Sequence, residues 1–345
     1  MELGKKIKQL RCRASLTQEQ LAERLGISPQ SVSKWENAVA MPDISLLPLI
    51  AETFGVSIDD LFDLTVEQRF NRIENRMDLE EEFPADVYLE YEELLKAQLP
   101  EARHKKRATE LLANLYWHRM NAYALKVRRY AKESIRMEPN KKGCQWLLCD
   151  AEGHAVWDWN FGNHLAAIEF YSDLVKENPE SRSAMMYLMD NLLADHRADE
   201  AEQLLNRFCV VNKDRIFMNQ VYRAHIALAR FDAATADGII EDMLAANPDH
   251  DGVQFEAAQY YARKCDYEKA IAHYEKSFAC NPMRPRYYDP LDAIMQIYKI
   301  KGDYRKALET CDRILDLLQN EWSMTEEELA LKEVRAKRAE LLAKV

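Results

Sequence analysis

The chain has 345 residues, of which 48% are apolar, and a formal net charge of −11. This length suits two domains, or one small domain followed by a repeat array, and the negative charge argues against a protein that coats nucleic acid by charge alone. Only 9 Gly and 11 Pro are present, while Ala, Leu, Glu and Lys are plentiful, so the composition predicts an all-α protein.

The first residues predict two short helices. An apolar stripe runs through a first helix that should end near Arg13. Thr17 followed by Gln20 is a capping-box pattern, in which the hydroxyl and the amide satisfy free backbone N–H groups at a helix start. A second helix is therefore expected over about residues 18–25.

A tight turn and a third helix follow directly. Gly26 can adopt the left-handed conformation that ends a helix. Ser28 and Pro29 are residue types favoured at the N-cap and at the first helical position. The sequence therefore predicts a third helix over about residues 29–36, joined to the second by a short turn.

The third helix divides its side chains by polarity. Val32 and Trp35 are spaced to be buried together, which leaves small polar side chains on the other faces. A glutamine can pair with the edge of adenine, and a lysine can bind guanine or a phosphate. The side chains expected to read a DNA groove are Gln30, Ser31, Ser33 and Lys34.

Two further helices are expected to complete a five-helix domain over residues 1–64. After a loop over residues 37–42, an apolar stripe through Leu46, Leu49, Ile50 and Phe54 predicts a fourth helix. Residues 56–62 predict a short fifth helix.

Residues 16–62, which run LTQEQLAERLGISPQSVSKWENAVAMPDISLLPLIAETFGVSIDDLF, resemble the Cro/lambda-repressor-like helix-turn-helix family, also called Xre. The resemblance implies a sequence-specific regulator that binds a two-fold operator in double-stranded DNA as a homodimer. It also implies DNA contacts for Gln18, Ser28, Gln30, Ser31, Ser33, Lys34 and Asn37, with Gln18 on a phosphate and Asn37 on the backbone. Pro29 stands where some members carry a base-reading glutamine. The alternative interpretation is that these are ordinary solvated polar residues.

Residues 65–84 are predicted to form a helical linker. Phe70, Ile73 and Met77 share one side of this helix, which would suit either a dimer contact or a connector that packs on the next helix. Pro84 marks the expected boundary of the domain that follows.

Residues 85–345 are predicted to form a helical repeat domain. The motif at residues 266–271 recurs at residues 303–308, and Pro248 and Pro282 lie 34 residues apart. This period resembles tetratricopeptide repeats, which are antiparallel helix pairs stacked into an α-solenoid. About five units are expected from about residue 148, after three or so diverged helices, with a charged capping helix over about residues 325–344.

Such a solenoid has a concave groove lined by the first helix of each pair. Alignment of the units on their alanine and proline landmarks places a polar stripe in this groove, made of Asp190, His225, Gln259 and Gln296. Asn191 and Asn219 are nearby candidates. The groove is expected to bind a peptide or a partner protein, although a concave face can also simply be solvated. Helix-turn-helix proteins with such repeats resemble the peptide-responsive quorum-sensing regulators of Gram-positive bacteria, which makes a signalling peptide the first expectation.

Other classes of protein find little support. No phosphate loop, dinucleotide fingerprint or catalytic elbow is present, so neither an enzyme nor a cofactor is expected. The seven cysteines include no Cys-x-x-Cys pair, which predicts reduced thiols and no metal site. No apolar run approaches the roughly twenty residues of a membrane span, so we expect a cytoplasmic protein without a membrane segment. The open alternatives are an interaction adaptor that its first domain localises to DNA, and a scaffold that has lost DNA binding.

Overall fold

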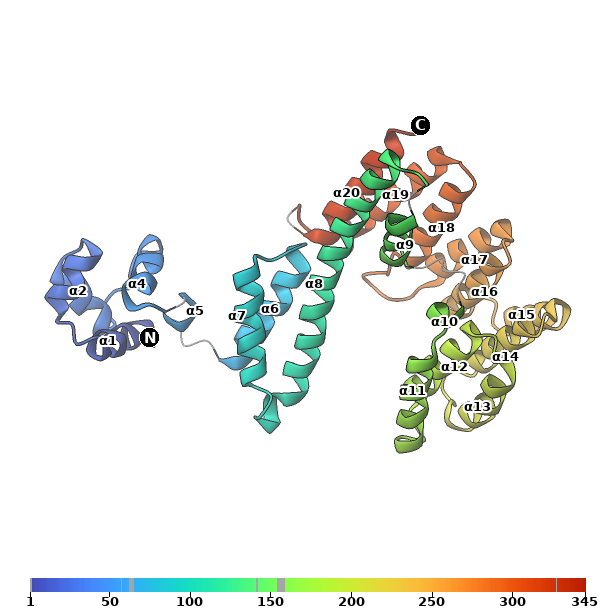
Figure 1. Cartoon of the computed structure of the whole chain (residues 1–345), viewed down its shortest axis with the longest axis horizontal. Helices are drawn as coiled ribbons and strands as arrows, with labels where there is room; N and C mark the ends of the chain where they lie inside the picture. Colours follow the sequence, from blue (N-terminus) through green and yellow to red (C-terminus); the bar gives the residue numbers. More distant parts are fainter. Residues whose placement is uncertain (1, 57, 62–64, 141, 154–158, 327) are drawn as a thin grey trace. The chain divides into compact units, whose positions relative to one another are not determined.

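The computed structural model describes residues 2–56, 58–61, 65–140, 142–153, 159–326 and 328–345. Every regular element in these ranges is a helix, which confirms the all-α prediction (Figure 1). The chain divides into two compact units, residues 1–121 and 122–345. The domain boundaries predicted at residues 64 and 84 stay a prediction.

The first helices form a small domain with its own core. Its elements are α1 (Glu2–Arg13), α2 (Gln18–Leu25), α3 (Pro29–Glu36), the 3₁₀ turn η1 (Ile44–Leu46), α4 (Leu47–Phe54) and α5 (Ile58–Leu61). The predicted bounds of α2 and α3 are confirmed, because the capping signals operate as expected. Both hydrogen bonds of the Thr17–Gln20 capping box are present, and Gly26 has a φ of 66°. Ser57 and Phe62 of the predicted fifth helix lie outside the described residues.

The fourth helix corrects one expectation. Leu49 was expected in the apolar stripe but is 37% exposed, whereas Leu47 is buried. The α-helix begins at Leu47, after the 3₁₀ turn, so the buried stripe passes through Leu47, Ile50 and Ala51. This spacing of three and four residues directs one face of α4 to the core.

An ion pair with little solvent exposure joins α1 to α3. The guanidinium of Arg11 donates to both carboxylate oxygens of Glu36, at 2.6 and 2.9 Å, and to the carbonyl of Leu16 at 2.8 Å. The Gln18 amide of α2 donates to the same carboxylate at 2.8 Å. Burial alone would raise the pKa of Glu36, but the hydrogen bonds from Arg11 and Gln18 outweigh it, and the pKa lies below its ordinary value. One carboxylate thus links three helices.

The next three helices share a separate core. They are α6 (Val66–Leu79), α7 (Ala85–Ala97) and α8 (Ala102–Met137). Phe70 and Ile73 of α6 are fully buried among residues of α7 and α8, and Met77 packs against the same cluster. The apolar stripe of α6 is therefore covered by the chain's own helices, which favours its interpretation as a connector.

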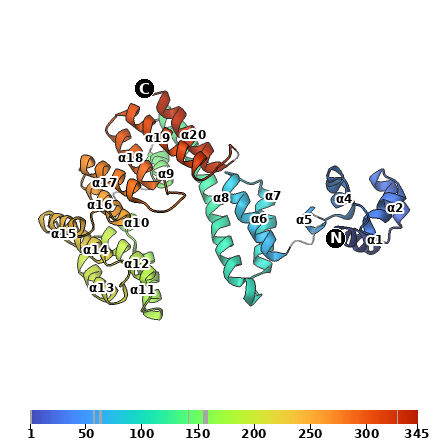
Figure 2. The ribbon, with the colours of Figure 1, turned by 180° about the vertical axis from the view of Figure 1, so that it is seen from behind.

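The second unit continues as a succession of antiparallel helices (Figures 1 and 2). They are α9 (Lys142–Ala151), α10 (Trp159–Gly162), α11 (Leu165–Glu177), α12 (Arg182–Ala194), α13 (Ala198–Val211), α14 (Phe217–Ala229), α15 (Ala233–Ala246), α16 (Asp251–Arg263), α17 (Tyr267–Cys280), α18 (Asp289–Ile300), α19 (Tyr304–Asn320) and α20 (Leu329–Leu342).

The repeat landmarks lie where helix pairs need them. Ala201, Ala236, Ala270 and Ala307, each in the second helix of a pair, are completely buried, so neighbouring helices can approach closely. Pro248 and Pro282 follow the ends of α15 and α17 by two residues, where proline prevents a helix from continuing. These features confirm tetratricopeptide-like helix pairs. No helix in the described ranges combines the length and the apolar character needed to cross a membrane.

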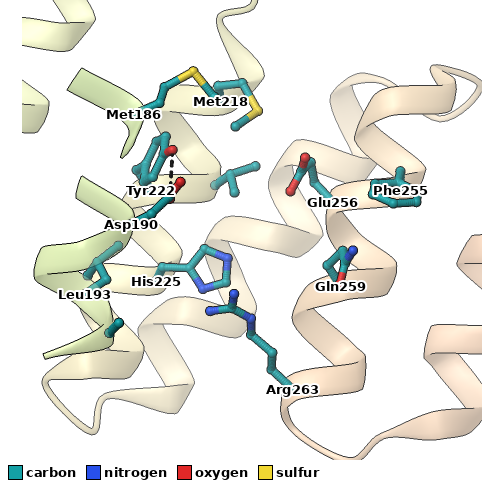
Figure 3. Close-up of a pocket in the computed structure, with 12 residues that line it drawn as sticks. Met186, Asp190, Leu193, Met218, Tyr222, His225, Phe255, Glu256, Gln259 and Arg263 are labelled. Carbon is teal, nitrogen blue, oxygen red and sulfur yellow. Dashed lines mark hydrogen bonds between the residues drawn. The ribbon is translucent and has the colours of Figure 1, made fainter. Parts of the chain in front are cut away.

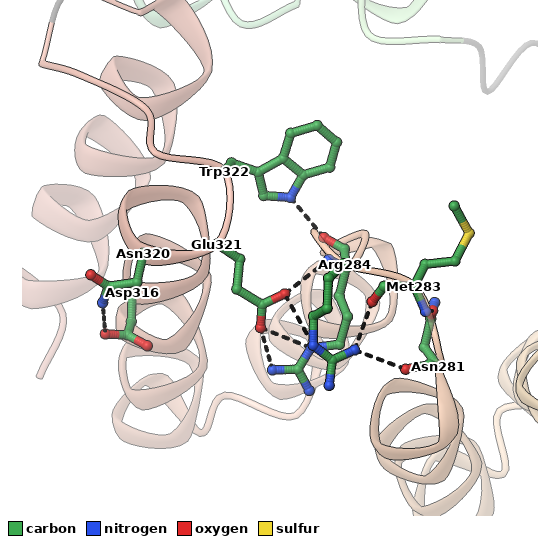
Figure 4. Close-up of polar contacts among 8 residues, drawn as sticks. Asn281, Met283, Arg284, Asp316, Asn320, Glu321 and Trp322 are labelled. Atoms are coloured by element: carbon green, nitrogen blue, oxygen red, sulfur yellow. Dashed lines mark hydrogen bonds and ion pairs between the residues drawn. The ribbon is translucent and has the colours of Figure 1, made fainter.

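A longer connection joins α17 to α18 and is held in place by the end of α19. Glu321 accepts hydrogen bonds from the backbone N–H of Arg286, at 2.9 Å, and from its guanidinium. The Trp322 indole donates to the Arg286 carbonyl at 2.7 Å (Figure 4). This connection is thereby fixed to the last repeat pair.

Replacing Gly4 with alanine should destabilise the first domain. A Cβ at Gly4 would lie 1.9 Å from the carbonyl oxygen of Trp35, so α1 would have to move away from α3. We expect a loss of about 1–3 kcal/mol in the free energy of unfolding. Hydrogen exchange measured by mass spectrometry in the full chain should show faster exchange over residues 2–56. The control is Gly238→Ala on α15, where a Cβ meets nothing within 4 Å; equal exchange in both variants would contradict the close approach.

Replacing Glu36 with glutamine should also loosen this domain, because the Arg11 guanidinium keeps only 12% side-chain exposure and loses its counter-charge. We expect a cost of about 3 kcal/mol at neutral pH. Since the folded-state pKa of Glu36 is lowered, its contribution is present above the unfolded-state pKa and is lost as the pH falls through the folded-state value. Stability of the two proteins should therefore converge in acid. The exposed Glu23→Gln variant is the control, and parallel pH profiles for wild type and Glu36→Gln would refute the assignment.

Candidate nucleic-acid interface and repeat groove

The start of α3 is fixed by two serines. The backbone N–H of Ser31 donates to the hydroxyl of Ser28 at 3.2 Å, and the two hydroxyl oxygens lie 2.9 Å apart. Ser28 thus serves as the N-cap, with Pro29 at the first helical turn. Both hydroxyls remain near the surface, and their contacts fix the position at which α3 begins.

Gln30 and Lys34 are the two most available polar side chains of α3. Both are exposed, and they lie one helical turn apart on one face while Val32 and Trp35 are buried. Within the described part of the chain, neither side chain makes a hydrogen bond or an ion pair. An external partner can therefore engage both without breaking an internal contact.

Three other predicted contact residues already have internal roles. Gln18 donates to Glu36, which commits one of its two amide hydrogens. The Asn37 amide donates to the carbonyl oxygen of Ser33, at 2.9 Å, and approaches its hydroxyl at 3.4 Å. The Gln18–Glu36–Arg11 arrangement was not foreseen, because no short-range signal links residues 25 positions apart.

A hollow of about 350 Å³ lies between α12, α14 and α16 in the second unit (Figure 3). These are first helices of successive pairs, as a concave repeat groove requires. The lining comprises Met186, Asp190, Leu193, Ala194, Met218, Val221, Tyr222, His225, Phe255, Glu256, Gln259 and Arg263. A second hollow of about 340 Å³ shares Phe255 and Gln259 and reaches Asp292 of α18 and Lys337 of α20. We call these two adjacent hollows the repeat groove.

The structure brings together only part of the predicted polar stripe. Asp190, His225 and Gln259 line the first hollow, whereas Gln296 lies outside the lining of both. The Asn191 amide donates to the Tyr187 carbonyl of its own helix at 2.7 Å.

Asn219 is a correction to the predicted groove set. It is only 9% exposed and accepts a hydrogen bond from the Asn212 amide at 2.9 Å. The two asparagines form a buried polar pair between α13 and α14, so Asn219 cannot face a groove ligand. Nearness in sequence to the aligned groove positions could not distinguish a side chain turned toward the neighbouring helix from one turned into the groove.

Burial controls the electrostatics of the first hollow. The Tyr222 hydroxyl donates to Asp190 at 3.0 Å, yet burial raises the pKa of Asp190. Burial also raises the pKa of Glu256, and the charge of Asp190 adds to this effect. Burial, with a smaller effect from the positive charge of Arg263, lowers the pKa of His225 to about 4, so this imidazole is neutral at pH 7.

Tyr222, Glu256 and Arg263 were missed by the sequence interpretation. Each lies three or four residues from a predicted groove position, and therefore one helical turn away on the same face. Extending the stripe by one turn in both directions would have found them. Among the described residues, no group of His, Cys, Asp or Glu side chains could hold a metal ion.

A family model described as helix-turn-helix matches residues 7–61. The HTH-type transcriptional activator BcrR of Enterococcus faecalis is 46% identical over 61 residues, or 18% of this chain and 30% of BcrR. The HTH-type transcriptional regulator MJ0272 of Methanocaldococcus jannaschii is 42% identical over 57 residues, or 16% of this chain and 86% of that protein. Antitoxin PezA of Streptococcus pneumoniae is 31% identical over 114 residues, or 33% of this chain and 59% of PezA. The chain thus spans less than a third of BcrR.

Among solved structures, the chain aligns with PlcR of Bacillus thuringiensis in complex with the peptide PapR7 and DNA, over 99% of this chain and 98% of PlcR, at 13% identity and a TM-score of 0.27. It aligns with ComR of S. thermophilus in complex with DNA and its signalling peptide ComS over 89% of this chain and 99% of ComR, at 14% identity and a TM-score of 0.25. The family rests on the first domain, where sequence match and helix geometry agree. The chain belongs to the helix-turn-helix family of transcriptional regulators.

Proposed function

We propose that the chain binds a two-fold operator in double-stranded DNA through α3, and that a peptide or partner protein in the repeat groove changes its affinity for this operator. The observation that carries the DNA-binding part is the exposed pair Gln30 and Lys34. Their side chains make no hydrogen bond or ion pair within the described part of the chain. The second helix of a helix-turn-helix lies in the major groove of DNA, where its side chains meet the base edges.

The side chains of Gln30 and Lys34 can bind both the base edges and the phosphates of DNA. The Gln30 amide can give one donor and one acceptor to adenine, and the Lys34 ammonium can bind guanine or a phosphate. With only local positive charge available in a chain of net charge −11, affinity must come from fitted contacts at a particular site. The capped start of α3 holds the two side chains in a fixed register.

The repeat groove supports the regulatory part of the proposal. It combines apolar side chains such as Met218 and Phe255 with an imidazole and an amide, at His225 and Gln259. A ligand held there regulates DNA binding if it prefers one arrangement of the DNA-binding domains over another.

We expect Gln30→Ala to relax base preference at one position of each half-site by about 1–3 kcal/mol, because its bidentate contact is lost. Lys34→Ala should weaken binding to all sequences and reduce the slope of affinity against salt by about one. Selection from a random DNA pool, at several salt concentrations, measures both effects in the full chain. Lys105→Ala, an exposed lysine of α8 outside the domain, is the control. Weak, salt-steep binding without an enriched motif would instead favour the adaptor.

A second copy of the chain is part of the proposal, because a two-fold operator is read by two recognition helices. The second unit offers a surface for it on α8, where Tyr123, Val127, Tyr130 and Met137 are 48%, 37%, 61% and 76% exposed. Their separations of four, three and seven residues match the apolar seam of a coiled coil. We infer that this face packs against the same face of a second copy.

The double variant Tyr123→Ser/Tyr130→Ser should shift the protein toward monomer, since two aromatic side chains leave the contact. Sedimentation equilibrium of the full chain measures this shift, and we expect the dissociation constant to rise by at least about tenfold. Arg136→Ser, an exposed arginine on another face of the same helix, is the matched control. A double variant that dimerises as tightly as the control would place the interface elsewhere.

A further inference from the structure

The first hollow of the repeat groove holds more negative charge than its own cations balance. Asp190 and Glu256 both line it, and Arg263 is the cation of the same lining. Asp190 receives its hydrogen bond from the Tyr222 hydroxyl, which is a neutral donor. Glu256 has no hydrogen bond or ion pair in the described part of the chain.

Arg263 only partly offsets the charge of this pair: it lowers the pKa of both carboxyls, but less than burial raises them. It lies seven residues after Glu256 on α16, which is about 10 Å along a helix. Figure 3 shows its guanidinium beside His225, at the opposite end of the hollow from Glu256. The hollow therefore has an acidic end, between Asp190 and Glu256, and a basic end at Arg263.

Glu256 is half-buried and has no hydrogen bond in the described part of the chain, so its lost hydration is not replaced by any direct partner. Asp190 is more exposed and has only the neutral Tyr222 hydroxyl as a hydrogen-bond donor. The raised pKa values of Asp190 and Glu256 reflect this loss of hydration. A positively charged group placed between them would supply both the missing charge and hydrogen-bond donors.

The rest of the lining indicates what carries this charge. Met186, Met218 and Phe255 are large apolar side chains, and methionine adapts its shape to different partners. Gln259 can bond to a backbone amide, and it is shared with the second hollow, so an extended chain can continue along the groove. A small inorganic cation would use none of these features.

We propose that the repeat groove selects a short peptide with an ammonium or guanidinium group, which lies between Asp190 and Glu256 while an apolar side chain of the peptide contacts Met218 and Phe255. This inference rests on the proposed function of the groove as a peptide site. It adds the charge that the peptide must carry and the end of the hollow where that charge binds.

The test uses the full chain and pooled synthetic heptapeptides in which one position is fixed as Lys, Glu or norleucine, with the amino terminus either free or acetylated. Affinity selection with mass spectrometry identifies the peptides retained, and titration calorimetry measures the best of them. We expect retained peptides to be enriched in lysine or in free amino termini. Their affinity should fall by at least about tenfold in Asp190→Asn/Glu256→Gln.

Two further variants make the result decisive. Asp242→Asn, an exposed aspartate of α15 outside the groove, should bind as the wild type does. Glu256→Lys should change the preference toward peptides with glutamate, which a merely unfolded variant could not do. Thermal unfolding confirms that each variant is folded.

The outcomes separate this inference from the function on which it rests. Retention of neutral or acidic peptides by the wild type would overturn the charge preference and leave the peptide site in place. Retention of no heptapeptide by any variant would overturn both. Cationic peptides whose binding is unchanged in Asp190→Asn/Glu256→Gln would show that the charge is read elsewhere.

Discussion

The repeat domain depends on one constraint: a pair of short antiparallel helices has more apolar surface than it can bury by itself. Each pair must therefore cover its neighbour, and the completely buried alanines at positions 201, 236, 270 and 307 allow this close approach. Stacking with one consistent geometry leaves the first helices of the pairs on a common side. The groove and its unbalanced charges follow from this arrangement, because α12, α14 and α16 bring side chains from distant parts of the sequence into one hollow.

The first domain combines a small apolar core with a buried polar contact. Its helices have 8 to 12 residues in α1, α2 and α3, so the core is small. Glu36 adds a polar link among these three helices, through Arg11 and Gln18. A buried ion pair gains its stability from good hydrogen bonding, and both oxygens of this carboxylate accept hydrogen bonds. Helix α3 is thus held at its last residue, Glu36, and capped at its start by Ser28.

Local signals predicted the helix bounds well, and tertiary contacts were harder to foresee. Capping residues such as Thr17 and Ser28 act within a few positions, so α2 and α3 could be placed from sequence alone. Leu49 was wrongly assigned to the core. The 3₁₀ turn before α4 shifts the buried face of the helix, and this turn could not be foreseen from the apolar pattern. Asn219 was wrongly assigned to the groove, because its hydrogen bond with Asn212, the residue that caps the end of α13, could not be foreseen from sequence. Both errors concern which way a side chain faces, and neighbouring elements decide that.

The exposed face of α3 has a consequence for how such a protein can diverge. Gln30 and Lys34 contribute no internal hydrogen bond in the described structure, whereas Ser28, Ser33 and Asn37 hold the two ends of the helix. Under the proposed function, substitutions at these two positions after gene duplication would redirect one copy to a different DNA sequence without a penalty in folding. Surface positions of this kind are usually neutral for stability. The capping residues carry no such freedom, so new paralogues can change their targets while keeping the same scaffold.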